Sequence, residues 1–524
     1  MVGQELNALL LSQFSIKIEN ARKIVQRAAQ NGFLATSAPL TFGKGQYVYL
    51  VNGLPFTKAI AASICKKYRP PVYRLIEALD MNNGIISYYE ALKITASPEE
   101  DTSSKINTLP EILTLLSKLN FTYEYTDERL VKYIISKREG SELGGIIQDK
   151  LAEDHYFKMV RDCMFIPDII RWLQVSNIID NVYVRYRNKN KPSKGAEHNG
   201  HVFDAFAYTK TTGINTIVGK KAGIKEKQTC VLMDIVINRD YDLVDVDGFY
   251  NRVQIYLRSV KSGVRKAMPI VIYKCISKHA FNTLRSLGFM AFDLGSIFGS
   301  RVYEIMDKLN TIDDFQNLEK EEIEDAIESA LSIMRESGQE DNLKAIKGAL
   351  FEYLMYPILN VIFPKAQVYQ GKQYKEKVNG MDEGYEYDYI IKSSQPNEIV
   401  VVELKGYAAN RHVNLGSTDK RDRGSLKWFF ERSLPFAKKQ LAKEIGDGIP
   451  FKAAFITSGN FYDDGEAYLA ILNSSSLKSR LINVSYDGTE LLQLLKRYDE
   501  TKTMETIKKF YTDIPEIDVE LNKT

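Results

Sequence analysis

The chain has 524 residues, with 70 Lys or Arg against 67 Asp or Glu, so its formal net charge is only +3. This balance excludes a uniformly basic protein, and any nucleic-acid-binding surface must be a local patch. The length allows about three or four domains.

The cysteines and the N-terminus indicate the cellular compartment. Cys65, Cys163, Cys230 and Cys275 are widely separated and fit no zinc-binding spacing. The N-terminus lacks a basic stretch followed by an apolar leader, so we expect free thiols in a reducing cytoplasm. No apolar run approaches the ~20 residues needed to span a membrane, and we expect no membrane-embedded segment.

Residues 1–66 predict a helix followed by a two-stranded hairpin. Ser15 is suited to cap a helix that runs to about Gln30. Apolar side chains recur on one face of this helix at Ala21, Ile24, Val25 and Ala28. The hairpin would turn at Phe42-Gly-Lys-Gly45 and carry Lys44 at its tip.

This pattern resembles winged-helix DNA-binding domains, with the hairpin as the wing. The rest of the helix surface carries side chains that reach phosphates and base edges, namely Arg22, Lys23, Gln26 and Arg27. With Lys44, they form the predicted DNA-binding surface. A protein-interaction domain with a solvated basic face is the alternative.

Residues 67–149 predict a second winged-helix-like domain. A helix follows Arg69-Pro-Pro71, two more helices cover about 85–96 and 109–119, and 121–135 predict a hairpin. The third helix has few basic residues, so packing or a partner contact is as plausible for it as DNA binding.

Residues 150–310 predict an α/β domain. A helix over about 154–174 precedes strands that carry Asp204 and Asp234, and two further helix and strand pairs follow. An insert between the strands is rich in Gly and Lys, including Lys220 and Lys221, which suits phosphate binding. The alternative for this insert is a solvated flexible loop.

Residues 311–340 are acidic and predict a helical linker, and residues 341–524 predict a second α/β domain. Within that domain, 387–391 and 399–404 predict two strands, of which the second is almost wholly β-branched and therefore a buried central strand. Asp388, Glu403 and Lys405 lie at the strand ends. Carboxylates there are costly unless they bind something, and Mg²⁺ prefers such oxygen ligands.

An Asp followed by Glu403-Leu404-Lys405 resembles the PD-(D/E)XK, or restriction-endonuclease-like, nuclease superfamily. The Pro that often precedes the Asp is replaced by Tyr387. A surface hairpin is the alternative, but it does not explain three consecutive valines. The Ser458-Gly459 turn after a later strand resembles the Mrr-like branch, which usually pairs a winged helix with the nuclease domain.

The resemblance implies further site residues. Family members often carry an acidic residue on the first core helix, and Glu352 holds that place on a helix over about 341–356. It is expected to bind metal together with Asp388 and Glu403, beside Lys405. Arg421 and Arg423 follow the active strand, where a DNA backbone would approach.

Residues 150–310 repeat the same order of helix, strands and helices, with Asp204 matching Asp388 and Asp234 matching Glu403. Val236 stands where Lys405 is expected. We therefore predict a multidomain α/β protein with an N-terminal winged-helix region followed by two restriction-endonuclease-like domains, the first degenerate. An unrelated α/β domain is the alternative for the first.

These features predict a metal-dependent endonuclease that hydrolyses double-stranded DNA with Mg²⁺, or with Mn²⁺ as a substitute. A restriction or anti-phage effector is the expected biological role. A nuclease subunit that needs a protein partner, such as a transposase or an ATPase, is a second hypothesis. A non-catalytic DNA-binding protein on a nuclease scaffold is the third, and RNA is an alternative substrate. One intact site per chain favours a homodimer for double-strand cleavage.

Overall fold

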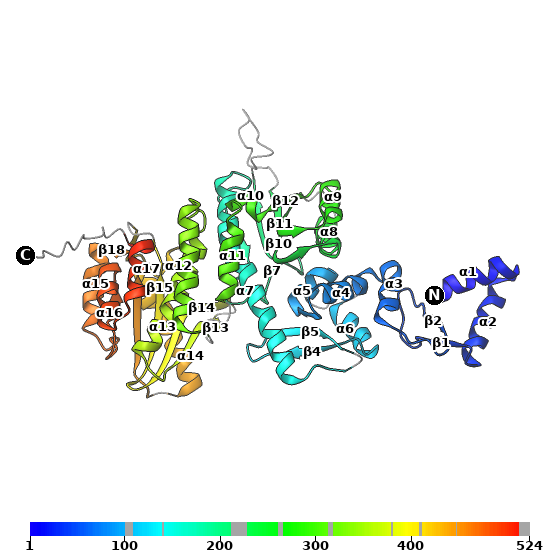
Figure 1. The fold of residues 1–524 in the computed structure, drawn as a ribbon, viewed down its shortest axis with the longest axis horizontal. Coiled ribbons are helices and arrows are strands. Elements are labelled where there is room, and N and C mark those ends of the chain that lie inside the picture. The colour runs from blue at the N-terminus through cyan, green and yellow to red at the C-terminus, as the bar shows by residue number, and fades with distance from the viewer. Residues whose placement is uncertain are drawn as a thin grey trace, which may run out of the picture. The chain divides into compact units, whose positions relative to one another are not determined.

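The computed structural model describes residues 1–99, 108–138, 141–210, 228–259, 266–312, 318–378, 381–407, 411–446 and 448–512. The chain is a multidomain mixed α/β protein that forms two compact units, Met1–Ile297 and Phe298–Thr524 (Figure 1).

The first unit begins with two helices and a two-stranded antiparallel sheet: α1 (Gly3–Phe14), α2 (Ile18–Gln30), β1 (Leu34–Thr36) and β2 (Tyr49–Val51). The helix α1 was not predicted. Ser15 ends α1 in a left-handed conformation with φ 50°, and Lys17 is the N-cap of α2, so the predicted role of Ser15 as N-cap is wrong. The predicted apolar face of α2 is only partly buried: Ala21 and Val25 are buried, whereas Ile24 is 46% exposed.

A helical region with a small sheet follows. Its elements are α3 (Lys58–Tyr68), α4 (Pro70–Met81), β3 (Ile85–Ser87), α5 (Tyr88–Thr95), α6 (Leu109–Lys118), β4 (Thr122–Thr126) and β5 (Lys132–Ser136). The three strands are arranged β3-β5-β4. The predicted helix over 85–96 is thus a strand and then a helix. Ser87 and Glu90 form a capping box that makes Tyr88 the first helical residue.

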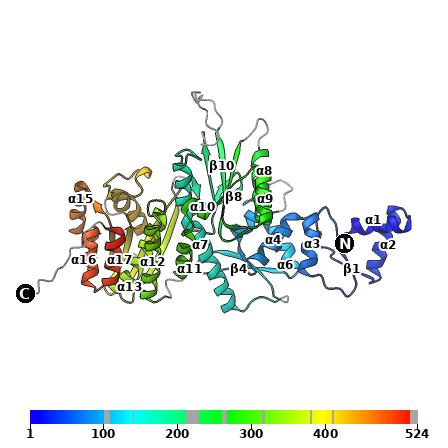
Figure 2. The ribbon, with the colours of Figure 1, turned by 45° about the horizontal axis from the view of Figure 1, so that its top comes forward.

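The rest of the first unit is a five-stranded sheet in the order β12-β11-β10-β9-β6. The long helix α7 (Gly145–Val175) packs on β10, and α8 and α9 lie together on the other face (Figures 1 and 2). The elements are β6 (Arg185–Tyr186), β9 (Ala205–Thr209), β10 (Thr229–Tyr241), α8 (Leu243–Arg258), β11 (Ala267–Ile276), α9 (Lys278–Ser286) and β12 (Met290–Asp293), with a hairpin of β7 (Ala196–His198) and β8 (His201–Phe203) beside them.

The second unit is built on a five-stranded sheet in the order β13-β14-β15-β17-β19. Helices α12, α13 and α17 contact one another beside this sheet (Figure 2). The elements are α11 (Val302–Thr311), α12 (Lys320–Glu336), α13 (Lys344–Ile362), β13 (Gln367–Val378), β14 (Met381–Ser394), β15 (Asn397–Lys405), a π-helical turn η2 (Trp428–Ser433), α14 (Leu434–Ile445), β17 (Phe451–Thr457), α15 (Asp463–Asn473), β19 (Ser485–Tyr486), α16 (Gly488–Arg497) and α17 (Thr501–Tyr511).

The two large sheets have the same topology. In each, an outer strand and its neighbour are antiparallel, the neighbour is antiparallel to the central strand, and two parallel strands complete the other side. The central strands are β10 and β15. The repeated order of elements read from the sequence is therefore present as a repeated strand order.

One helix of the described residues, α13, has the length and hydropathy of a membrane span. Its apolar side chains are buried within the second unit, including Ile346, Leu350, Leu354 and Ile358. The helix therefore has the burial of a core helix, which explains its apolar composition.

Candidate active site

The central strand β15 changes from fully buried to partly exposed at its C-terminal end. Val400, Val401 and Val402 are completely buried. The side chains of Glu403 and Lys405 are 16% and 21% exposed, respectively. The valines hold the strand in the core, and the charged residues reach the edge of the sheet where solvent and ligands have access.

Asp388 lies on β14, next to the last backbone pair between β14 and β15, Tyr389 with Val402. Its carboxylate accepts a hydrogen bond from the backbone N–H of Leu404 at 2.7 Å. This bond ties Asp388 to the residue between Glu403 and Lys405. The sequence predicted both residues at adjacent strand ends; β15 does end at Lys405, but Asp388 lies in the middle of β14, at the point where the pairing with β15 stops.

Glu403 and Lys405 form an ion pair, with 2.5 Å between Oε1 and Nζ. Burial, together with the charges of Asp388 and Glu352, raises the pKa of Glu403 to about 7, although Lys405 opposes this shift. Burial disfavours the charged form of Lys405, but the carboxylates of Glu403 and Asp388 outweigh it and hold its pKa above the usual value. Lys405 is therefore charged, whereas Glu403 is only about half ionised at neutral pH.

Glu352 lies on α13, next to this cluster. The hydroxyl of Tyr389 donates a hydrogen bond to the backbone carbonyl of Glu352 at 2.9 Å, which fixes the helix against β14. The Glu352 carboxylate is close enough to contribute to the raised pKa of Glu403. Asp388, Glu403 and Lys405 thus meet at the end of β15, and Glu352 lies near enough to affect the pKa of Glu403. Among the described residues, no three Asp, Glu, His or Cys side chains are already arranged to hold a metal ion.

Gly406 allows α13 to approach the end of β15. A Cβ atom at this position would lie 2.5 Å from the Cβ of Phe351, the residue before Glu352. Any side chain larger than hydrogen would push the helix away from the strand. This packing role could not be predicted from the sequence, because a lone Gly after a strand has no distinctive pattern.

Residues after β17 support the end of β15. The Thr457 hydroxyl donates to the carbonyl of Lys405 at 3.0 Å, as does the Ser458 N–H at 3.1 Å. The Ser458 hydroxyl in turn accepts from the N–H of Tyr407 at 2.8 Å. These bonds fix the backbone of Lys405. The Ser-Gly turn noted in the sequence is the local signal for this support.

The predicted basic residues near the site are exposed. Arg421 is 88% exposed and pairs with Asp419 at 3.1 Å. The guanidinium of Arg423 lies 5.7 Å from the ring centre of Trp428, and this indole is buried. Trp428 therefore packs in the core and is not a stacking platform.

The predicted DNA-binding residues of the first unit, Arg22, Lys23, Gln26, Arg27 and Lys44, are also exposed. The four α2 residues share one helix, and Lys44 lies in the connection between β1 and β2 with φ 48°. Lys220 and Lys221 lie outside the described residues.

Comparisons with known proteins leave the family open. No protein-family model and no curated protein sequence matches the chain. One solved structure, protein VC1899 from Vibrio cholerae, matches 45% of this chain and 76% of its own length, with 13% identity and a TM-score of 0.22. A likeness of that size carries no argument on fold or function.

Proposed function

We propose that the chain is a metal-dependent DNA endonuclease whose active site is formed by Asp388, Glu403, Lys405 and Glu352. The observation that supports this best is the charge of the cluster. Three carboxyl groups stand beside one ammonium, so the acidic groups outnumber the basic one. That excess suits one divalent cation with oxygen ligands.

Carboxylate and carbonyl oxygens are the ligand types that Mg²⁺ prefers. Asp388 and Glu403, with the Leu404 carbonyl and Glu352, would hold it. The pKa of Glu403 is raised mainly by burial, and the neighbouring charges of Asp388 and Glu352 add to this shift; a bound cation would oppose both effects. A bound Mg²⁺ supplies Lewis acidity to the scissile phosphate and lowers the pKa of a water ligand.

The side chains have separate roles in this proposal. Lys405 stays protonated and donates hydrogen bonds to the attacking water or to the negative charge that develops on phosphate. Asp388 is held in place by the Leu404 N–H. The exposed Arg421 and Arg423 would contact the DNA backbone, and α2 with Lys44 would form a second DNA contact.

Two further assignments belong to this proposal. Double-strand cleavage would need two such centres, so we propose that two chains act together on DNA. Cys65, Cys163 and Cys230 are buried free thiols, which fits a reducing cytoplasm.

Cleavage of supercoiled plasmid by the purified protein is expected to require Mg²⁺ and to stop in EDTA. Excess Mg²⁺ added after EDTA should restore it, because the carboxylates stay in place without the cation. Agarose gel electrophoresis measures nicked and linear products. Cleavage that is unaffected by EDTA would contradict the metal role. DNA binding without cleavage in Mg²⁺ or Mn²⁺ would favour a partner-dependent subunit or a non-catalytic binding protein.

The affinity for Mn²⁺ is expected to rise about tenfold from about pH 6 to about pH 8, because the ionised form of Glu403 binds the cation and its pKa is about 7. Binding at neutral pH should release about half a proton per ion. Calorimetric titration in buffers of different ionisation enthalpy measures both quantities. A flat affinity over this range would contradict the role of Glu403.

The raised pKa of Glu403 also predicts the direction in which folding stability changes with pH. The folded-state pKa lies above the ordinary value of 4.5. The stabilisation from protonated Glu403 is therefore fully present below the ordinary pKa and is lost as the pH rises through about 7. Mn²⁺ should offset this loss.

A further inference from the structure

The first large sheet contains a counterpart of the candidate active site. The backbone N–H of Ile235, the residue after Asp234, donates to the Asp204 carboxylate at 2.8 Å. Leu404, the residue after Glu403, makes the same bond to Asp388 at 2.7 Å. The two donors lie on the central strands, Ile235 on β10 and Leu404 on β15. Asp388 lies on β14, the antiparallel neighbour of β15, and Asp204 immediately precedes β9, the antiparallel neighbour of β10. Asp204 therefore corresponds to Asp388, and Asp234 to Glu403.

A third carboxylate, Asp162, lies on α7, a helix that packs on the central strand as α13 does in the second unit. It accepts hydrogen bonds from the N–H groups of Ile237 at 3.0 Å and Asn238 at 3.2 Å. The first sheet thus also gathers three carboxylates at its central strand.

Three cationic side chains are paired with these carboxylates. Lys93 of α5 binds both Asp204 and Asp234, with 2.7 Å from Nζ to Oδ1 of Asp234. Arg187 lies 2.9 Å from Asp204 and 3.5 Å from Asp162, and Arg252 lies 3.1 Å from Asp234. Each of the three carboxylates therefore already has a cationic partner.

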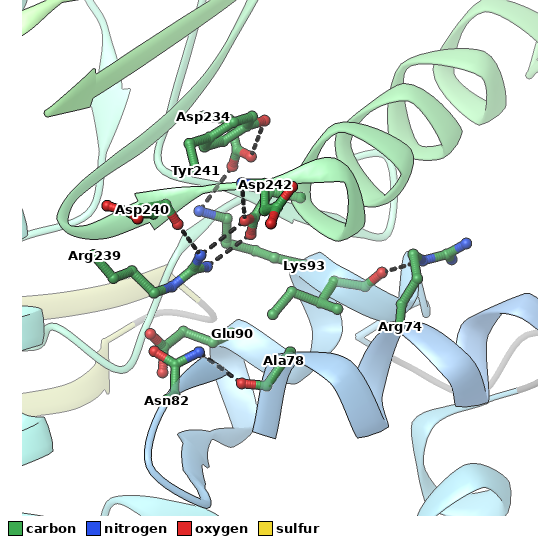
Figure 3. A network of polar contacts seen from close by, with 12 residues as sticks. Arg74, Ala78, Asn82, Glu90, Lys93, Asp234, Arg239, Asp240, Tyr241 and Asp242 are labelled. Carbon is green, nitrogen blue, oxygen red and sulfur yellow. Dashed lines mark hydrogen bonds and ion pairs between the residues drawn. The ribbon is translucent and has the colours of Figure 1, made fainter. Parts of the chain in front are cut away.

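The side chains of the cluster are little exposed to solvent, although Lys93, Asp162 and Asp234 line a cavity of about 210 Å³. The side chain of Lys93 is 8% exposed, and those of Asp204 and Asp234 are 0% and 2% exposed. Figure 3 shows the Lys93 side chain extending from α5 toward Asp234 of β10. The corresponding carboxylate and ammonium of the second unit, Glu403 and Lys405, are more exposed.

Two glycines allow neighbouring segments of the chain to pack closely against α5. A Cβ on Gly195 would lie 2.2 Å from the ring of Tyr89, and one on Gly248 would lie 2.8 Å from the carbonyls of Lys93 and Ile94. Glycine at both places lets α5 approach the sheet and α8. The Tyr89 hydroxyl also donates to Asp204 at 2.9 Å.

Arg74 of α4 caps the C-terminal end of α5. Its guanidinium donates to the carbonyls of Ile94 at 2.6 Å and Thr95 at 2.8 Å. These are carbonyls of the last turn, which have no partner within the helix. Figure 3 includes Arg74 in the same network as Lys93 and Asp234.

We propose that the ion pairs of Lys93 with Asp204 and Asp234 lock α5 and its helical region onto the first large sheet. The lock does not depend on the function proposed for the second unit. In this proposal, the first large sheet has a structural role, because it holds the helical region around α5 in a fixed position.

Replacing Lys93 with Met keeps most of the side-chain volume and removes the charge. We expect the unfolding midpoint of the first unit to fall by about 10 °C, because removing one partner leaves the buried carboxylates undercompensated. The control is Lys158→Met, a half-buried lysine of α7 that lines the same cavity of about 210 Å³ as Lys93. Its midpoint should stay within about 2 °C of the unchanged protein.

A double variant separates the ion pair from loss of packing. Lys93→Met with Asp204→Asn should lose less than the sum of the two single losses, because one change removes the partner of the other. Differential scanning calorimetry of the full chain measures all four proteins. Strictly additive losses, or a Lys93→Met variant as stable as Lys158→Met, would overturn the proposal.

The unchanged protein provides a test that does not depend on folding of a variant. In hydrogen exchange followed by mass spectrometry, peptides covering 88–95 should be as protected as those covering 229–236, because α5 and β10 open together. Early exchange of the α5 peptide while β10 remains protected would show that α5 is not locked and would overturn the proposal.

Discussion

Asp388→Asn is expected to abolish Mg²⁺-dependent cleavage and to weaken Mn²⁺ binding by at least about 100-fold, since outer partners of metal ligands alone contribute up to that much. The amide oxygen of Asn still accepts the hydrogen bond from the Leu404 N–H, so the strand ends should keep their positions. Plasmid cleavage and calorimetric titration with Mn²⁺ measure the two losses, and circular dichroism checks the fold.

The control for this variant is Glu383→Gln. Glu383 lies on the same strand and pairs with Arg432 at 3.2 Å, so its replacement removes a carboxylate without removing a proposed metal ligand. Cleavage by Glu383→Gln should remain near that of the unchanged protein. Full cleavage by Asp388→Asn, or its loss together with the fold, would count against the catalytic assignment.

Lys405→Met is expected to lower cleavage by about 100- to 1000-fold while Mn²⁺ still binds, because one preorganised donor to developing charge contributes about that much. Loss of the ammonium removes the charge that lowers the pKa of Glu403, so this pKa should rise further above about 7. Metal binding by the variant should therefore need a higher pH than binding by the unchanged protein.

Single-turnover cleavage at saturating Mg²⁺ and Mn²⁺ titrations across pH measure these two effects separately. Lys452→Met is a matched control, because Lys452 lies on the neighbouring strand β17 and contacts only the carbonyl of Ser476 among the bonds described for it. A Lys405→Met variant that loses metal binding at every pH, or one that cleaves normally, would refute the separate role of Lys405.

The two large sheets differ most in the number of cationic side chains that pair with their carboxylates. In the second unit, one ammonium from the central strand stands beside three carboxylates and leaves a negative excess. In the first unit, Lys93, Arg187 and Arg252 neutralise the three corresponding carboxylates. The same topology therefore supports a candidate cation site in one unit and a cluster of paired charges in the other.

The sequence by itself determined the features that depend on neighbours along the chain. Three consecutive valines before Glu403 specified a buried central strand, and the two-residue spacing of Glu403 and Lys405 put both side chains on one face. The repeated order of helices and strands predicted the repeated strand order. It also matched Asp204 with Asp388, and the hydrogen bonds to Ile235 and Leu404 show the same correspondence.

Only the tertiary structure decided the features that join distant segments. Lys93 lies 111 residues before Asp204, and no local pattern distinguishes it from a solvated lysine on a short helix. Its role depends on α5 fitting against Gly195 and Gly248, which are far from it in sequence. Charge balance in a buried site is a sum over all side chains that packing brings together, so it follows from the fold and not from spacing along the chain.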